Sequence, residues 1–256
     1  LSGTADPVAT DIPRNTGMAT GRLHAALSGL HRPGFETRAA TREDLAGWLG
    51  TAEATFRAAV QAVAAVDAGL AARIEAASQA VRAALRPLGD RSIPIRLQRI
   101  HGDLHVGQVL PGPDDVLLVD FEGDPTRDPR DRRALAPPLR DVAAFLRSID
   151  HVARSGFRRA GALGNQPLGS GPLGPGPSVA LDAWIEAARA AFLEGYALGL
   201  GDTAWALDRD LLRAFEVEKE LGEFVYAATF LPEWLYAPTG GLGALLGSPF
   251  QPVRAE

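Results

Sequence analysis

Apolar residues recur at helical spacing along most of the chain, and turn residues divide it into segments. Residues 16–30 are expected to form one helix, because their apolar positions recur at helical spacing: Met18, Leu23, Ala26, Leu27 and Leu30. Thr41 is placed to cap a second helix through Leu49. The alanine-rich stretch 51–86 predicts one long helix or two, ending near Pro87.

The pattern changes after residue 90. Residues 95–100 predict a short strand and residues 101–108 a loop. Residues 109–110 and 116–119 predict a hairpin, because the five residues between them are turn formers. The second of these strands is a continuous apolar run, which predicts that it is buried on both faces.

Helical spacing returns in the second half of the chain, over residues 139–153, 179–199 and 206–230. Residues 1–15 hold few apolar positions and predict a linker, and the Gly- and Pro-rich segment 161–178 predicts a flexible surface loop. Residues 16–256 are therefore expected to form one α+β domain that is mostly α, with a small β-hairpin in its middle.

Composition excludes several classes of protein. The chain has 256 residues, 46% of them hydrophobic, which suffices for one large core or two modest ones. No apolar run reaches the roughly 18 residues that a membrane-spanning helix needs. There is no cysteine, and the net charge is −5, so disulfides and a basic nucleic-acid surface are not expected.

The candidate chemistry lies in and after the predicted loop. Asp103 stands five residues before Gln108, and Asp120 follows the buried strand. Phosphoryl transfer needs a group that accepts the proton of the attacking hydroxyl, and oxygen ligands that hold Mg²⁺. We therefore expect Asp103 to be the catalytic base and Gln108 and Asp120 to bind the metal, with Glu122 as an outer or second-metal ligand.

Two other classes share parts of this pattern. His101, Asp103 and His105 form an H-x-D-x-H cluster that could mark a metal-dependent hydrolase, although such a site normally needs a further ligand. A non-catalytic kinase-like binding module is the other alternative, and it is disfavoured because all three acid and amide positions are present. We expect His101 and His105 to support the loop.

The segment resembles the catalytic and metal-binding loops of the aminoglycoside phosphotransferase-like kinases. In that family His-Gly-Asp is followed, after four residues, by Asn and later by an Asp at a strand end. Here Gln108 replaces the asparagine, and with His105 and the Asp-Phe-Glu-Gly-Asp-Pro run this is similar to the actinobacterial maltokinase and glucosamine kinase branch. The likeness covers residues 16–245 and implies the helical C-terminal lobe of a protein-kinase-like fold, with ATP, Mg²⁺ and a cytoplasmic location.

The acceptor is expected to be a small sugar. Carboxylates of the last long helix, Glu218 or Glu223, are expected to face an ammonium group, and Trp234 to offer an aromatic face to a pyranose ring. Glu216, Glu220 and Glu223 share one face of this helix, and the alternative is that these carboxylates form a solvated face with Lys219 and Arg213 nearby. The resemblance favours glucosamine, giving the 6-phosphate, over maltose, giving the 1-phosphate.

The parts that would hold the nucleotide are not evident. The single lysine, Lys219, stands far along the chain from the metal residues, and the G-x-G-x-x-G match at 169–174 has no flanking strand. We expect the N-terminal, nucleotide-binding lobe of the same protein to be absent from this chain. By that expectation the chain alone binds ATP poorly and does not turn over.

Overall fold

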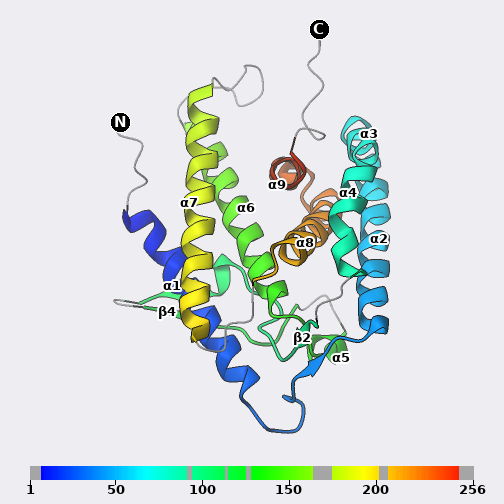
Figure 1. The fold of residues 1–256 in the computed structure, drawn as a ribbon. Helices are drawn as coiled ribbons and strands as arrows, with labels where there is room; N and C mark the ends of the chain where they lie inside the picture. Colours follow the sequence, from blue (N-terminus) through cyan, green and yellow to red (C-terminus); the bar gives the residue numbers. More distant parts are fainter. Residues whose placement is uncertain are drawn as a thin grey trace. The chain divides into compact units, whose positions relative to one another are not determined.

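The computed structural model is mostly helical with short strands, as the sequence predicts (Figure 1). Backbone contacts divide the chain into two compact units: residues 1–38 with 97–206, and residues 39–96 with 207–256. The structure describes residues 7–90, 94–112, 115–124, 128–163, 175–201 and 207–247.

Three long helices form the frame of the first unit. They are α1 (Pro7–Ser28), α6 (Leu139–Leu163) and α7 (Pro175–Leu200). The helices α6 and α7 run alongside each other, and α1 packs along α7 (Figure 1). A short helix, α5 (Pro129–Arg132), precedes α6.

The contact between α1 and α7 is unusually close because glycines meet on both helices. A Cβ at Gly17 would collide with the main-chain carbonyl of Phe192, and one at Gly199 with that of Met18. Removing side chains from a helix face lets two backbones approach. Residues 7–15, assigned to a linker by the sequence, are helical and continue α1 toward the N-terminus. They were missed because they hold few apolar positions from which a helical period could be recognised.

The hairpin lies in the first unit and has one solvated face. A short 3₁₀ turn (Val106–Gln108) leads into β3 (Val109–Pro111), which pairs antiparallel with β4 (Val116–Leu118). Val109 and Val116 are buried, whereas Leu117 is 66% exposed. The prediction of a strand buried on both faces is therefore wrong, because an antiparallel pair covers only one face.

Two further strands stand where the chain passes between the units, β1 (Arg38–Ala39) and β2 (Arg96–Leu97). The strand expected over residues 95–100 is thus only two residues long. Beyond it, Gln98 forms an isolated antiparallel bridge with Ala136.

The second unit is helical, and α8 (Arg209–Phe230) contacts most of its other elements. These are α2 (Arg42–Ala64), α4 (Ser78–Leu85), a 3₁₀ turn (Arg86–Leu88), a second 3₁₀ turn (Pro232–Trp234) and α9 (Tyr236–Leu246). The short α3 (Ala68–Ala76) joins α2 to α4.

Capping residues set the boundaries of α2 and α3. Thr41 and Asp44 form a reciprocal capping box at the start of α2, as the sequence predicts for Thr41. The helix then runs through Leu49 without a break and ends at Ala64. Asp67 starts α3 by accepting the Leu70 N–H at 2.8 Å, so residues 42–85 form three helices.

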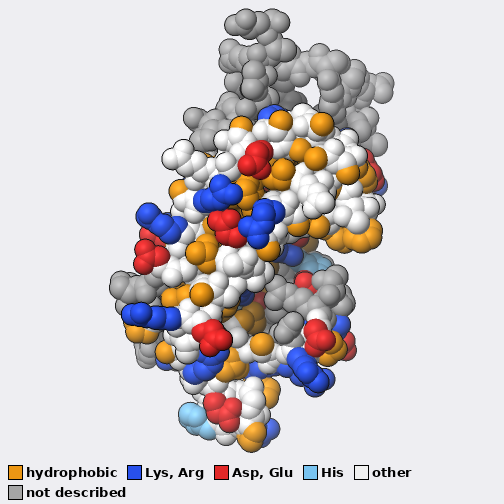
Figure 2. Space-filling model, turned by 90° about the vertical axis from the view of Figure 1, so that its right-hand side faces the viewer, with side chains coloured by type: hydrophobic (Ala, Val, Ile, Leu, Met, Phe, Trp, Pro, Cys, Tyr) orange, Lys and Arg blue, Asp and Glu red, His pale blue; other side chains and the backbone are white. Residues whose placement is uncertain are grey.

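Charged side chains of both signs are interspersed on the face of the molecule in Figure 2. Within the second unit, Glu53 lies 3.4 Å from Arg82 and 3.9 Å from Arg57. Exposed pairs of this kind add little to stability. In the part of the chain that the structure describes, every helix is too short or too polar to cross a membrane.

Candidate active site

The loop that carries Asp103 is fixed through its main chain. The N–H groups of His101 and Gly102 donate to the carboxylate of Asp141, at 2.7 and 2.9 Å. Asp141 lies in the first turn of α6 and is 1% exposed. A buried carboxylate that accepts several N–H groups holds them tightly, because those bonds are charge-assisted.

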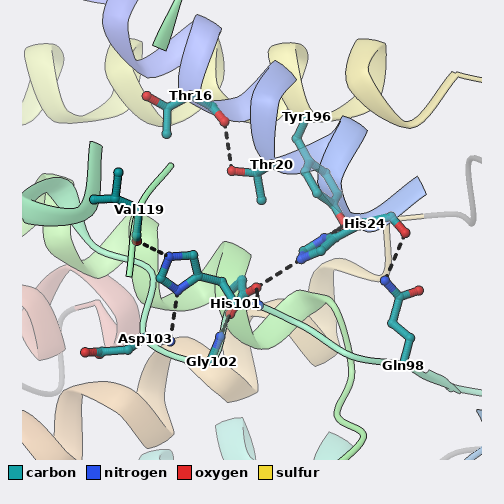
Figure 3. A network of polar contacts seen from close by, with 10 residues as sticks. Thr16, Thr20, His24, Gln98, His101, Gly102, Asp103, Val119 and Tyr196 are labelled. Carbon is teal, nitrogen blue, oxygen red and sulfur yellow. Dashed lines mark hydrogen bonds and ion pairs between the residues drawn. The ribbon is translucent and has the colours of Figure 1, made fainter. Parts of the chain in front are cut away.

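His101 connects the loop to the strand that leads to Asp120 (Figure 3). Its Nδ1 faces the N–H of Asp103 at 3.4 Å, and its Nε2 lies 2.9 Å from the carbonyl oxygen of Val119. Since the carbonyl needs a donor, Nε2 carries the proton. Both ring nitrogens are therefore engaged, which argues against His101 as a metal ligand and against the hydrolase alternative.

Gly102 allows the loop to approach the segment after Asp120. Its φ is +88°, in the left-handed region that side chains disfavour, and a Cβ there would lie 3.3 Å from Cα of Gly123. Backbone geometry thus favours glycine at the middle position of the His-Gly-Asp sequence.

Gln108 and Asp120 meet, as the sequence predicts. The amide Nε2 of Gln108 donates to Oδ2 of Asp120 at 3.0 Å, and the N–H of Val119 donates to the carbonyl of Gln108 at 3.0 Å. Asp120 is the only described residue other than glycine with a positive φ, +66°. An aspartate tolerates this conformation better than most side chains do, and here it turns the carboxylate toward the loop.

This donor set fits magnesium. Mg²⁺ is bound in proteins by one or two carboxylates, with other hard oxygen donors, phosphates and water. The amide oxygen of Gln108 and the carboxylate of Asp120 are such donors, and their side chains are already in contact. Glu122 is exposed two residues farther along.

His105 lies between Asp103 and Gln108. Its Nε2 is 4.0 Å from Oδ2 of Asp103 and 3.3 Å from Nε2 of Gln108, while its Nδ1 accepts the N–H of Gly107 at 3.1 Å. The loop thus brings the expected base, amide and carboxylate into one neighbourhood. In the described ranges, no three His, Asp or Glu side chains are grouped as a metal site would require.

A buried network behind the loop was not foreseen from the sequence. His24 of α1 contacts Asp141 through Nε2 and Tyr196 of α7 through Nδ1, both at 3.0 Å (Figure 3). Its own carbonyl accepts the side-chain amide of Gln98 at 3.0 Å. These residues are too far apart in the chain for any local pattern to connect them.

The candidate sugar-binding residues belong to the second unit. Glu218 is buried, and Glu223 forms an ion pair of 3.0 Å with Lys219. Trp234 is 44% exposed, with its ring 6.2 Å from that of Tyr236, so it is not ordinary core packing. The interpretation of the neighbouring acids as a solvated face is wrong, because Glu216 and Glu220 are buried.

Neither nucleotide-binding feature considered from the sequence gains support. Residues 169–174 lie outside the described residues. Lys219 is paired with Glu223 on α8.

Comparisons with known proteins agree on one family. Residues 3–175 match the model of the phosphotransferase enzyme family. A glucosamine kinase of Streptacidiphilus jiangxiensis is 32% identical over 232 residues, which is 90% of this chain and 48% of that protein. A glucosamine kinase of Mycolicibacterium smegmatis is 31% identical over 245 residues, 94% of this chain and 55% of that protein.

Solved structures give the same result. A glucosamine kinase in complex with glucosamine, ADP and inorganic phosphate aligns with a TM-score of 0.73 and 30% identity, covering 91% of this chain and 54% of that one. A glucosamine kinase in another crystal form aligns with a TM-score of 0.76 and 30% identity, covering 93% and 54%. The chain thus spans about half the length of the relatives that it matches.

Proposed function

Because the chain belongs to the phosphotransferase enzyme family, we propose that a protein containing it transfers the terminal phosphoryl group of ATP to a hydroxyl of a small sugar. The observation that carries this proposal is the 3.0 Å contact between Gln108 and Asp120, in a loop whose Asp103 lies beside His105. A cytoplasmic location is proposed with it, since the reaction consumes ATP.

The roles follow from the chemistry of each group. Asp103 orients the acceptor hydroxyl and accepts its proton as the new bond to phosphorus forms. Gln108 and Asp120 would hold Mg²⁺, with Glu122 as an outer ligand. Bound Mg²⁺ neutralises negative charge on the nucleotide phosphates. His101 links Asp103 to the end of the strand, because its ring bonds both the N–H of Asp103 and the carbonyl of Val119.

Glucosamine is the proposed acceptor, phosphorylated at its 6-hydroxyl. Two relatives about half covered by this chain are named glucosamine kinases, and one solved relative is in complex with glucosamine, ADP and inorganic phosphate. Glu223 offers a carboxylate that already forms an ion pair with an ammonium group, that of Lys219, so the sugar ammonium would have to share or replace this partner. We assign Glu223 and Glu218 to the sugar ammonium and the exposed Trp234 to the pyranose face.

An acceptor screen tests the proposal. The chain is assayed alone and within the longest translation product that contains it, with ATP, Mg²⁺ and glucosamine, maltose or an aminoglycoside. We expect phosphorylation of glucosamine above the others in the longer product. Preferential phosphorylation of maltose would overturn the acceptor, and stoichiometric zinc in the purified protein would overturn the reaction class.

A pair of aspartate variants tests the mechanism. Asp103→Asn is expected to lower kcat by at least about 100-fold, since a positioned base contributes roughly 10²–10⁴-fold. Asp115→Asn is the matched control, because Asp115 is exposed: its side chain pairs with Arg22 at the surface and accepts the N–H of Val116, which an asparagine oxygen can also accept. Equal activity of both variants would mean that Asp103 is not the base and would favour a binding module.

A further inference from the structure

The hydrogen bonds of His105 define which of its ring nitrogens carries the proton. The main-chain N–H of Gly107 donates to Nδ1 at 3.1 Å. An imidazole nitrogen that accepts a hydrogen bond has no hydrogen of its own, so in the neutral ring the proton is on Nε2. His105 therefore points an N–H donor, at 3.3 Å, toward the side-chain amide of Gln108.

That amide presents its own donor in return. The NH₂ group of Gln108 donates to Asp120 at 3.0 Å and also faces His105 Nε2. Two donors in contact gain nothing from each other. A half-turn of the amide about its last bond exchanges its oxygen and nitrogen, and the oxygen then accepts from His105.

The same half-turn changes the contact with Asp120. The amide oxygen now takes the place of Nε2, about 3.0 Å from a carboxylate oxygen. Two oxygens at this distance repel unless a cation lies between them. Ligands bound to one Mg²⁺ at roughly 2.0–2.1 Å and at right angles are about 2.9–3.0 Å apart. The spacing therefore suits a metal-bound pair without movement of either residue.

We propose that His105 is a positioning residue: its Nε2–H holds the amide of Gln108 in the orientation that presents oxygen to the metal. In the structure the amide donates to Asp120, and in the proposed metal-binding arrangement it would be turned so that its oxygen accepts from His105. The inference rests on the proposed function, because it assumes that Gln108 and Asp120 bind Mg²⁺.

The surroundings of His105 favour this role over a direct action on Asp103. The distance of 4.0 Å between His105 Nε2 and Asp103 Oδ2 exceeds a hydrogen bond. The imidazole lies over Gly107, where a Cβ would come 2.8 Å from its Cε1, so the missing side chain gives the ring its place. The loop backbone is anchored separately, by the bond of 3.0 Å from Val106 N–H to Ser148 Oγ.

Metal titration of four proteins tests the proposal without measuring activity. Mn²⁺, which accepts similar oxygen ligands, is titrated into the chain and free Mn²⁺ is followed by its EPR signal. The proteins are the parent, His105→Phe, Gln108→Glu and the double variant. Both end atoms of a glutamate are oxygens, so a glutamate needs no help with its orientation.

We expect His105→Phe to raise the Mn²⁺ dissociation constant about tenfold in the parent, the smaller of the losses typical for a ligand's hydrogen-bonding partner. In the Gln108→Glu background the same change should cost less than about threefold, because the amide is no longer there to be misplaced. Equal losses in both backgrounds, or none in the parent, would overturn the role of His105.

A second measurement needs no variant. Long-range ¹H–¹⁵N correlation of the imidazole in the parent chain reports which nitrogen is protonated, and we expect Nε2. A proton on Nδ1 would overturn the proposal.

The metal site is tested apart from His105 by Asp120→Asn. Unchanged Mn²⁺ binding by this variant would overturn the proposed function as well. A loss of Mn²⁺ binding by this variant, with no effect of His105→Phe, would overturn this inference alone.

Discussion

The imidazole of His24 lies 3.0 Å from the carboxylate of Asp141, and both side chains are buried. The same carboxylate accepts the main-chain N–H groups of His101 and Gly102. Asp141 therefore connects α1 to the backbone of the loop just before Asp103, and the position of the expected base depends on a residue that never reaches the substrate.

Asp141→Asn should destabilise the first unit and loosen the loop. An asparagine offers one acceptor oxygen, and its NH₂ group faces donors, so at least one buried N–H loses its partner. The expected loss is about 2–4 kcal/mol, from unsatisfied donors and from the lost charge-assisted bonds. Urea unfolding measures it. Asp115→Asn, at an exposed pair, should stay within about 0.5 kcal/mol. Similar losses of stability in both variants would contradict the role of Asp141 as the acceptor that stabilises the loop.

The glycine contact between α1 and α7 predicts a large effect of one methyl group. Gly199→Ala places a Cβ against the main-chain carbonyl of Met18. Backbone atoms, unlike the end of a side chain, cannot rotate away from it. The helices must separate, and we expect a loss of about 2 kcal/mol or more despite the higher helix propensity of alanine. Gly222→Ala in α8 has open space and should gain up to about 1 kcal/mol. Thermal unfolding compares the two, and equal shifts would count against the close packing.

The backbone conformation and the charge of Asp120 can be tested by different substitutions, because its φ is positive. Asp120→Asn keeps a side chain that tolerates the left-handed region, so its unfolding free energy should stay near that of the parent. Its Mn²⁺ affinity should fall by more than about tenfold, since even the loss of a hydrogen-bonding partner of a metal ligand costs that much. Asp120→Ala should lose the metal and also about 1 kcal/mol of stability. The prediction fails if asparagine destabilises as much as alanine does.

The acceptor assignment makes a prediction about selectivity. Glu223→Gln should lower kcat/KM for glucosamine by about tenfold or more, which corresponds to about 1.4 kcal/mol, and change it by less than about threefold for a neutral sugar. Lys219→Met serves as the control, because it breaks the same ion pair while keeping the carboxylate. Equal losses for both sugars would exclude an ammonium site at Glu223.

The central parts of the long helices and the hairpin were predictable because each is coded by local spacing. The bounds were not: α6 extends to Leu163 and α7 begins at Pro175, so both reach into the segment 161–178 that the sequence assigned to a flexible loop. The start of α8 beside Asp208, which accepts the N–H of Leu211, and the capping box at Thr41 are likewise local. The contact of Gln108 with Asp120 followed from the short hairpin between them, since an antiparallel pair returns the chain to its starting point.

The elements that the sequence did not indicate depend on distant contacts. The helix α9 holds three glycines and Pro238, a composition typical of a loop, and it packs against α8 and α4. His24 carries no local signal at all, because its partners Asp141 and Tyr196 lie more than 100 residues away. The approach of His105 to the Gln108 amide depends on how the 3₁₀ turn folds, and the ring tautomer of His105 is recorded by no sequence pattern.

Val119 makes two main-chain hydrogen bonds: its N–H donates to Gln108, and its carbonyl accepts from His101. Both involve the peptide rather than the isopropyl group, so nearly any residue that accepts the same backbone angles would serve at this position. The turn at the distal end of β3 and β4 takes no part in either bond. Insertions there would lengthen the ribbon outward and leave the spacing of Asp103, Gln108 and Asp120 as it is.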